Sequence, residues 1–316
     1  MAFAPSLSVL ASVYRGEEYL PGFFENLGAQ TVFPELELVL VLNDPSPREK
    51  TLARDFTARH PDQVQILFSP KLETLGASWN RAWLAARAPY LAIWNVDDRR
   101  VIDSLQRQLA ALEENPEAML CYGDYVSVGR YGEEEGPRRH TPPYGVGHFR
   151  RALAQGGAFW LLRRNVSERI GYFDEQFRIA ADMEFSFRLA AKGLPMVRAQ
   201  GLLGFFTNAA QGLSTRDGVQ ASAPERTAIQ LRYGVFDKVR REFLNPASAY
   251  RLDAIKISGD WIPLTSYLPE HEAYLRIRRP LWMLGSMRNA MRRLLQRLGL
   301  LPALHKAQDK YLKREI

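Results

Sequence analysis

The amino-acid sequence predicts an α/β protein whose first hundred residues form βαβ units around a mostly parallel sheet. Short runs of β-branched and other apolar residues alternate there with longer helical patterns, which is typical of this class. The runs are almost continuously apolar, as expected for strands that helices cover on both faces. The composition, 46% hydrophobic and 24% charged over 316 residues, is that of a globular chain and excludes disorder as the dominant state.

Four strands and three helices are expected in this first part. The strands are 7–13, 36–42, 64–68 and 90–94, and the helices are 17–30, 47–60 and 75–87. Pro61 and Pro89 end the second and third helices. Ligands of such sheets bind beyond the carboxyl ends of the strands, so the loops 14–17, 43–46 and 95–99 are expected to converge on one site.

The pattern loosens after the fourth strand. A helix at 104–114 ends before Pro116, and a loop rich in Gly, Pro and charged residues follows at 129–147. A Gly-Gly turn at 156–157, an apolar run at 158–162 and a helix at 182–192 come next. From Ala221 onward the chain is expected to be helical and aromatic and to pack against the preceding part.

The net charge of +7 is concentrated at the carboxy-terminal end. Residues 276–316 contain eleven Lys and Arg against two acids, a local charge of +9, which leaves −2 for the rest. The segment 276–301 has the pattern of a basic amphipathic helix, which either lies on an anionic membrane surface or packs on the core with its basic face in water. No recognised nucleic-acid-binding module accompanies this charge, so nucleic acid is not an expected partner.

Several features predict a cytoplasmic protein. No stretch approaches the roughly 18 consecutive apolar residues of a membrane-spanning helix. The apolar first 14 residues lack the basic start of a secretory signal. The single cysteine, Cys121, excludes an intramolecular disulfide and a Cys-rich metal site.

Two adjacent carboxylates, Asp97 and Asp98, directly follow the fourth strand, with Arg99 and Arg100 after them. Carboxylate oxygens are the ligands that Mg²⁺ and Mn²⁺ prefer, and arginines bind phosphate oxygens. The pair could therefore hold a metal ion that neutralises a diphosphate. The alternative is an acidic turn whose side chains cap the next helix.

Two further acids have both a functional and a structural interpretation. Asp182 either caps the helix 182–192 or points into the cleft and takes a proton from a substrate hydroxyl. Asp44 follows the second strand and precedes Pro45, so its side chain is presented at the same edge of the sheet. It either accepts a hydrogen bond from a pyrimidine ring N–H or forms an Asx turn.

The order of these acids resembles that of the family 2 glycosyltransferases. Residues 12–20 are similar to the family's first loop, and residues 75–80 to its Gly-Ala-x-x-Arg-Asn segment. Residues 95–98 are similar to its metal-binding Asp-x-Asp-Asp, and residues 181–193 to its acceptor-side motif. The resemblance covers roughly residues 6–216 and implies the GT-A-type, Rossmann-like nucleotide-diphospho-sugar transferase fold, with a mixed, mostly parallel central sheet and a helical C-terminal extension.

The resemblance also implies roles for individual residues. Asp182 would be the general base, Asp98 the direct ligand of Mn²⁺ or Mg²⁺, and the nucleotide would be bound by Val13, Tyr14, Glu17, Asp44, Asn80 and Asp97. Further contacts with the diphosphate or the acceptor are expected from Trp79, Arg99, Glu184, Ser214 and Arg216. Trp79 either stacks on a base or sugar or packs in the core, and Ser214 and Arg216 either contact phosphate or belong to an ordinary surface loop.

The chain departs from the family pattern at three positions. Arg15 replaces the usual Asn of the first loop, Trp79 replaces the usual Arg before Asn80, and Asn95 replaces the first Asp of the metal motif.

Together these observations predict an inverting, metal-dependent glycosyltransferase. It would move a sugar from a nucleotide diphosphate, a UDP-sugar before others, to a hydroxyl of a saccharide, lipid-linked or protein acceptor in polysaccharide or glycolipid synthesis. The catalytic domain would span 1–220, with a nucleotide-binding half at 1–100 and an acceptor half at 101–220, followed by the extension at 221–316. It would act in the cytoplasm or at the inner face of the membrane, in cell-envelope synthesis.

Two rivals stay open. A sugar nucleotidyltransferase should carry a Gly-rich, basic phosphate loop after the first strand, where this chain has only Arg15 and Gly16. A catalytically silent nucleotide-binding scaffold would tolerate the loss of Asp98 and Asp182.

Overall fold

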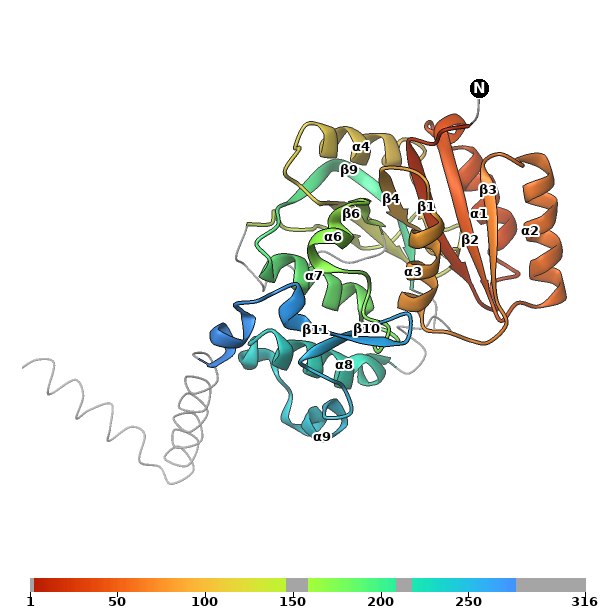
Figure 1. The fold of residues 1–316 in the computed structure, drawn as a ribbon. Coiled ribbons are helices and arrows are strands. Elements are labelled where there is room, and N and C mark those ends of the chain that lie inside the picture. The colour runs from red at the N-terminus through yellow and green to blue at the C-terminus, as the bar shows by residue number, and fades with distance from the viewer. Residues whose placement is uncertain (1–2, 146–158, 209–217, 277–316) are drawn as a thin grey trace, which may run out of the picture. The chain divides into compact units, whose positions relative to one another are not determined.

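The computed structural model describes residues 3–145, 159–208 and 218–276. Residues 1–269 form one compact unit and residues 270–316 form a second. The segment 221–269 therefore belongs to the same unit as the central sheet (Figure 1). The basic segment at 276–301 lies outside the described residues except for Arg276, and so does the Gly-Gly turn at 156–157.

A mixed, mostly parallel sheet forms the centre of the first unit. In the described part of the chain its strands follow the order β3-β2-β1-β4-β8-β6-β9-β5, and β7 pairs with β6. β1, β2, β3 and β4 are parallel to one another, β6 is parallel to β9, and β8 is antiparallel to both of its neighbours. The strands are β1 (Leu7–Val13), β2 (Leu36–Asn43), β3 (Val64–Ser69), β4 (Tyr90–Ile93), β5 (Arg99–Arg100), β6 (Leu120–Val128), β7 (Arg138–Arg139), β8 (Leu161–Arg163) and β9 (Met196–Thr207).

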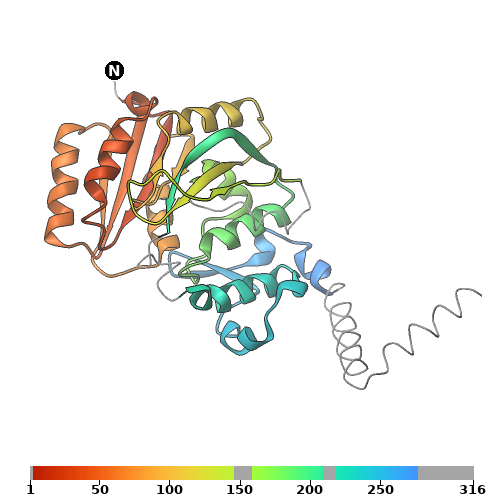
Figure 2. The ribbon, with the colours of Figure 1, turned by 180° about the vertical axis from the view of Figure 1, so that it is seen from behind.

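Helices cover both faces of this sheet. Helices α3 and α7 pack on one face, with α8 packed on α7, and α1, α2 and α4 pack on the other face, which Figure 2 shows from behind. The α-helices are α1 (Leu20–Gly28), α2 (Pro47–Arg59), α3 (Leu75–Ala85), α4 (Ser104–Glu113), α6 (Val166–Ile170), α7 (Ala181–Ala191), α8 (Gly218–Arg232) and α9 (Leu244–Ala247). Short 3₁₀ helices lie at Phe33–Glu35, Phe236–Lys238, Arg241–Phe243 and Leu264–Ser266.

The helix layers on both faces of the sheet explain why the strand sequences are almost continuously apolar. Every residue of β2 is buried, because both faces of the strand are covered. Glu37 is the one acid within this strand, and its carboxylate is fully buried. It accepts hydrogen bonds from the Ser8 hydroxyl at 2.6 Å and from the Arg87 backbone N–H at 2.9 Å, which compensates for its burial.

The four expected strands of the first part are confirmed to within one residue at each end. The helix expected at 17–30 is shorter, because the chain first forms a turn in which the Gly16 carbonyl accepts from the N–H groups of Tyr19 and Leu20. Strands β6 and β9 were not expected from the sequence. Both contain glycine and polar residues, and the left-handed Gly201, at φ 77°, breaks the alternation within β9.

The sequence analysis predicted a helical segment after residue 221, and this prediction is only partly correct. Strands β10 (Ala254–Ile257) and β11 (Asp260–Pro263) form an antiparallel hairpin. Its turn consists of Ser258 and Gly259, which have φ angles of 52° and 91°. Within the described ranges, no helix combines the length and the hydropathy that a membrane crossing requires.

Candidate active site

A pocket of about 440 Å³ opens at the carboxyl ends of β1 and β2. Its walls come from the loop after β1 and from the loop that joins β2 to α2. The lining residues are Tyr14, Arg15, Glu17, Glu18, Asp44, Pro45, Ser46 and Glu49. The structure thus brings the loops 14–17 and 43–46 together, as the strand order predicts.

Two lining residues have left-handed backbone conformations. Arg15 has a φ of 53° and Asp44 a φ of 51°, which costs a side-chain-bearing residue about 1–2 kcal/mol. The Asp44 N–H donates to the Ser69 carbonyl at 2.9 Å, which helps to hold this conformation. Because backbone strain of this kind concentrates at ligand sites, the two loops are candidates for binding a ligand.

Glu49 on the first turn of α2 fixes both loops. Its buried carboxylate accepts from the Gly16 N–H at 2.7 Å and from the Ser46 N–H at 2.8 Å. The Ser46 hydroxyl accepts from the Glu49 N–H at 3.1 Å, which completes a capping box, and it also donates to the Glu17 carboxylate. The helix start therefore determines the shape of the pocket.

The acidic turn after β4 is tied to the far end of β9. Asp98 is fully buried, and its Oδ1 accepts from the Thr207 N–H at 2.9 Å. Its Oδ2 accepts a longer hydrogen bond from the Asn95 amide at 3.3 Å. The Trp94 indole N–H donates to the Asp98 backbone carbonyl at 3.0 Å, so three hydrogen bonds stabilise the turn.

The two carboxylates of this turn differ in accessibility. Asp97 is half-buried, and burial raises its pKa. Burial also raises the pKa of Asp98 well above its usual range, and the negative charge of Asp97 adds to the effect. Two neighbouring acids in a site of low polarity form a donor set that a divalent cation would stabilise.

The donor set fits an ion that is only partly held by protein. Among the described residues, no three His, Cys, Asp or Glu side chains are placed to hold a metal ion together. Mg²⁺ and Mn²⁺ are commonly bound by one or two carboxylates and by phosphate oxygens of a substrate, which matches Asp97 and Asp98. For Asp98 to be the direct ligand, as the family resemblance implies, its Oδ2 would have to exchange the long hydrogen bond from Asn95 for the ion.

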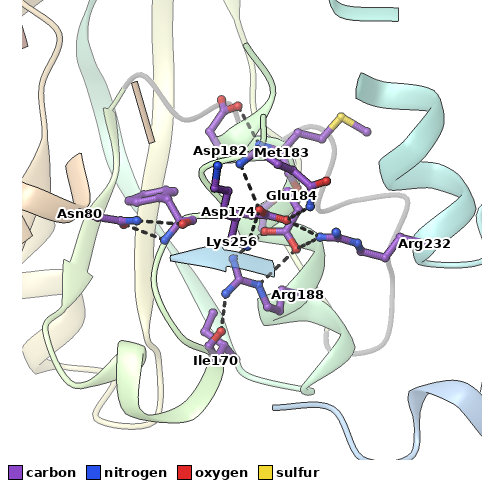
Figure 3. Close-up of polar contacts among 12 residues, drawn as sticks. Asn80, Ile170, Asp174, Asp182, Met183, Glu184, Arg188, Arg232 and Lys256 are labelled. Atoms are coloured by element: carbon purple, nitrogen blue, oxygen red, sulfur yellow. Dashed lines mark hydrogen bonds and ion pairs between the residues drawn. The ribbon is translucent and has the colours of Figure 1, made fainter. Parts of the chain in front are cut away.

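Asp182 lies in the first turn of α7, where α7 approaches α3 closely. A Cβ atom on Gly76 would lie 3.3 Å from the Ala181 Cβ, so glycine permits this approach. The N-cap residue is Ala180 rather than Asp182, and the Asp182 Oδ1 accepts from the Met183 N–H at 2.7 Å. Figure 3 shows that Asp182 points away from the buried arginines, on the opposite side from Glu184.

Tyr125 on β6 is a half-buried residue that the sequence analysis did not single out. Burial raises the pKa of its hydroxyl, Arg139 on β7 opposes the change, and the negative charges of Asp98 and Asp182 increase it. Asp98 and Asp182 are therefore both close enough to Tyr125 to influence its hydroxyl electrostatically. Gly123 and Asp124 interrupt the apolar residues before Tyr125, so the sequence pattern did not indicate this strand or its tyrosine.

Asn80 and Trp79, two of the predicted contact residues, point into the core. Asn80 is buried, and its side chain exchanges two hydrogen bonds of 2.9 Å with the backbone of Phe173. Trp79 is 4% exposed and packs against the Phe173 ring, with centroids 5.0 Å apart. The expected contact of Asn80 with the nucleotide is therefore corrected, because its side chain is engaged by the backbone of Phe173. Of the two interpretations of Trp79, the structure has the one in which it packs in the core.

Glu184 is also turned inward and does not face an acceptor. Its fully buried carboxylate forms ion pairs with Arg188 at 2.6 Å and with Arg232 at 2.9 Å, and it accepts from the Tyr233 hydroxyl at 2.6 Å (Figure 3). Burial favours its neutral form, but the two arginines hold the pKa of Glu184 below its usual range. Glu184 therefore links α7 to the end of α8. The prediction that it contacts the diphosphate or the acceptor is corrected.

The arginines after the acidic turn are also engaged by protein groups. Arg99 donates to the Gly132 carbonyl and pairs with Glu134, both at 3.2 Å. Arg100 is buried, donates to Gln108 at 2.7 Å and has a pKa lowered to about 9 by burial, so it is not placed for phosphate.

The remaining predicted residues are either at the pocket or beyond the described chain. Val13 is the buried last residue of β1 and precedes the pocket loop. Ser214 and Arg216 lie outside the described residues.

The family model that describes glycosyl transferase family 2 matches residues 8–173, just over half of the chain. A curated relative, the O-antigen biosynthesis protein RfbC of Myxococcus xanthus, is 28% identical over 222 residues. That match covers 61% of this chain but only 16% of RfbC, so the chain corresponds to a small part of that protein.

Two solved structures resemble the fold. TarS 1–349 of S. aureus in complex with UDP-GlcNAc has a TM-score of 0.60 at 15% identity, covering 78% of this chain and 73% of that one. The mannosyltransferase PcManGT of Pyrobaculum calidifontis, in complex with GDP-Man and Mn²⁺, has a TM-score of 0.54 at 15% identity, covering 99% of this chain and 81% of that one.

Proposed function

Because this chain belongs to glycosyltransferase family 2, we propose that it is an inverting, metal-dependent enzyme that moves a sugar from a nucleotide diphosphate to a hydroxyl acceptor. The observation that carries the proposal is the arrangement at one edge of the sheet. The strained pocket loops lie there beside the acidic turn after β4, since a Cβ atom on Gly16 would be 3.2 Å from the Val96 side chain.

In the proposed reaction, the pocket between β1 and β2 holds the nucleoside. Asp44 accepts from a ring N–H of the base, and Tyr14 and Glu17 line the space around base and ribose. A divalent cation, Mn²⁺ or Mg²⁺, bound at Asp97 and Asp98, would neutralise the charge of the diphosphate. These residues thus orient the donor with its diphosphate near the acidic turn.

Asp182 acts on the acceptor in the same proposal. Its carboxylate takes the proton of the acceptor hydroxyl while the oxygen attacks the anomeric carbon from the face opposite the diphosphate. The bond from the anomeric carbon to the diphosphate oxygen breaks, and the electron pair leaves with the nucleoside diphosphate. One displacement of this kind inverts the anomeric configuration.

The similar proteins support a nucleotide-sugar donor without fixing its base. TarS 1–349 was crystallised with UDP-GlcNAc and PcManGT with GDP-Man and Mn²⁺. We favour a UDP-sugar, the donor class in the TarS complex, and Asp44 can accept from the ring N–H of uracil as it could from that of thymine or guanine. The printed name of RfbC, an O-antigen biosynthesis protein, supports a saccharide or lipid-linked acceptor of the cell envelope, although a protein acceptor is open.

The proposal also includes a place of action. A cytoplasmic enzyme that touches the inner face of the membrane through the basic segment 276–301 would meet a lipid-linked acceptor directly. Binding of the whole chain to vesicles of anionic lipid, and its loss when the arginines of that segment are replaced by glutamine, would test this contact.

Calorimetric titration of the protein with UDP, GDP and dTDP, each with and without Mn²⁺, tests the donor site. We expect one nucleotide to bind in a metal-dependent way and Asp98→Ala to lose that binding. If none of the three nucleotides bound, the silent-scaffold alternative would be favoured. If binding did not depend on the metal, Asp97 and Asp98 would be structural.

The catalytic assignment needs a separate variant. Asp182→Asn should bind the nucleotide as the wild type does and lose about 100-fold or more of the transfer rate, as expected for the loss of a general base. Full transfer activity in a folded Asp182→Asn protein would exclude Asp182 as the base.

A further inference from the structure

The start of α7 has no capping side chain of its own, because its N-cap residue is Ala180. One carboxylate from another helix takes that place. Glu225 of α8 accepts hydrogen bonds from the N–H groups of Arg178, Ile179 and Ala180, at 2.9, 2.9 and 2.8 Å. The Glu225 side chain is buried, with the residue 3% exposed, so the three amides depend on it rather than on water.

Glu225 is itself held in place by packed neighbours. Tyr250 lies against it, and burial together with the charge and the hydrogen bond of Glu225 raises the pKa of Tyr250 to about 12. The Tyr250 ring stacks on Phe177 with centroids 5.3 Å apart. Seven residues further along α8, Arg232 pairs with Asp174 at 2.8 Å, which fastens the helix to the same loop.

We propose that Glu225 is a positioning residue for Asp182. The proposal rests on the proposed function, since it gives Asp182 the role of the base. Amides at the start of a helix attract the nearest carboxylate, and Asp182 follows the nest of three amides by only two residues. By satisfying those amides, Glu225 leaves Asp182 directed away from the buried core, as Figure 3 shows.

The sequence gives no local signal for this contact. Glu225 is 45 to 47 residues away from its three partners. It directly follows Pro224 inside α8, and the packing of α8 on α7 brings it to the three amides.

Glu225→Gln is the variant that tests the role. Glutamine keeps the shape of the side chain, but it has one acceptor oxygen and places an NH₂ group against an amide that donates. A matched control is Glu37→Gln, because Glu37 is an equally buried carboxylate that accepts from a backbone N–H, at the opposite ends of the strands from the pocket.

We expect Glu225→Gln to lower kcat for sugar transfer about tenfold or more, while the KM for the donor and the Kd for the nucleotide stay within about twofold. Hydrogen exchange of the amides at 178–183 should become faster in the same protein. Glu37→Gln should change neither kcat nor this exchange, even if it is less stable.

The two readouts separate this inference from the proposed function. Unchanged exchange at 178–183, or a wild-type kcat in Glu225→Gln, would overturn the positioning role. A parallel loss of nucleotide binding and kcat would overturn it as well, because a general structural defect would explain both. If the wild-type protein transferred no sugar, the proposed function would fail, whereas the exchange data would still show whether Glu225 holds the start of α7.

Discussion

The buried ion pairs between α7 and α8 allow a quantitative prediction for Arg232→Met. Arg232 and Arg188 balance the charges of Asp174 and Glu184, and all four side chains are fully buried. Arg232 also donates to the carbonyls of Arg251 and Ala254, at 2.5 and 2.7 Å. Methionine fills a similar volume but leaves one buried negative charge without its partner.

The expected loss of unfolding free energy is about 3–5 kcal/mol, the usual cost of removing one partner of a buried pair. The exposed pair of Arg240 with Glu242, whose side chains are about half-exposed, gives the matched control. Arg240→Met should leave the stability almost unchanged, because exposed ion pairs contribute little. Urea unfolding followed by tryptophan fluorescence measures both variants.

The pH dependence of Arg232→Met has a definite sign. Burial already raises the pKa of Asp174, and without Arg232 the pKa of this carboxyl should rise further. A raised native pKa means that stability is lost as the pH rises from the unfolded value of about 4 through the native pKa. The variant should therefore lie closer to the wild type at pH 5 than at pH 8. A loss that equals that of Arg240→Met, or that grows toward low pH, would refute the argument.

Three further changes test other parts of the structure. Glu49→Gln should raise the Kd of the nucleotide about tenfold, because one of the amides of Gly16 and Ser46 loses its acceptor, and an unchanged calorimetric Kd would contradict this. Tyr125→Phe should lower kcat about tenfold without changing nucleotide affinity, whereas a wild-type kcat would exclude a role for the hydroxyl that Asp98 and Asp182 influence. Asp124→Asn should cost about 2 kcal/mol at pH 7, because it weakens the charge-assisted hydrogen bonds that the buried Asp124 carboxylate accepts from the partly exposed Arg198 at 2.6 Å and from the Thr141 N–H at 2.9 Å. Burial alone would raise the pKa of Asp124, but the hydrogen bonds from the Thr141 amide and from Arg198 outweigh it and lower this pKa. The stability difference between the wild type and Asp124→Asn should therefore shrink as the pH falls below about 4. A difference that stayed constant in urea unfolding down to about pH 3.5 would contradict this argument.

The sequence predicted the parts of the fold that follow from local pattern. Strands β1 to β4 are buried on both faces, so their apolar runs could be recognised and their carboxyl ends located. The pocket loops with Tyr14 and Asp44 followed from that placement. By contrast, β6 and β9 include Gly123, Asp124 and Gly201, and a strand with such residues has no continuous apolar signature.

The misplaced site residues share one cause. Asn80, Trp79 and Glu184 all lie on helices near the site, and the family pattern does not say which side of the helix faces the core. Packing decided that question, by placing Phe173 against α3 and Arg232 against α7. Partners such as Glu225, which are far apart in sequence, could not be found from residue spacing.

The same contacts imply that nucleotide binding and base placement are separable in this chain. The pocket depends on Glu49 and on strands whose helices α1 and α2 pack on one face of the sheet. Asp182 depends on α3 and α7, which pack on the other face, and on α8, which packs on α7. A substitution in α8 should therefore disturb the position of Asp182 more than it disturbs the nucleotide pocket. We therefore expect Arg232→Met, under conditions where it is still folded, to lose more in kcat than in nucleotide affinity. Equal losses in kcat and affinity would mean that the two faces of the sheet act as one structural element.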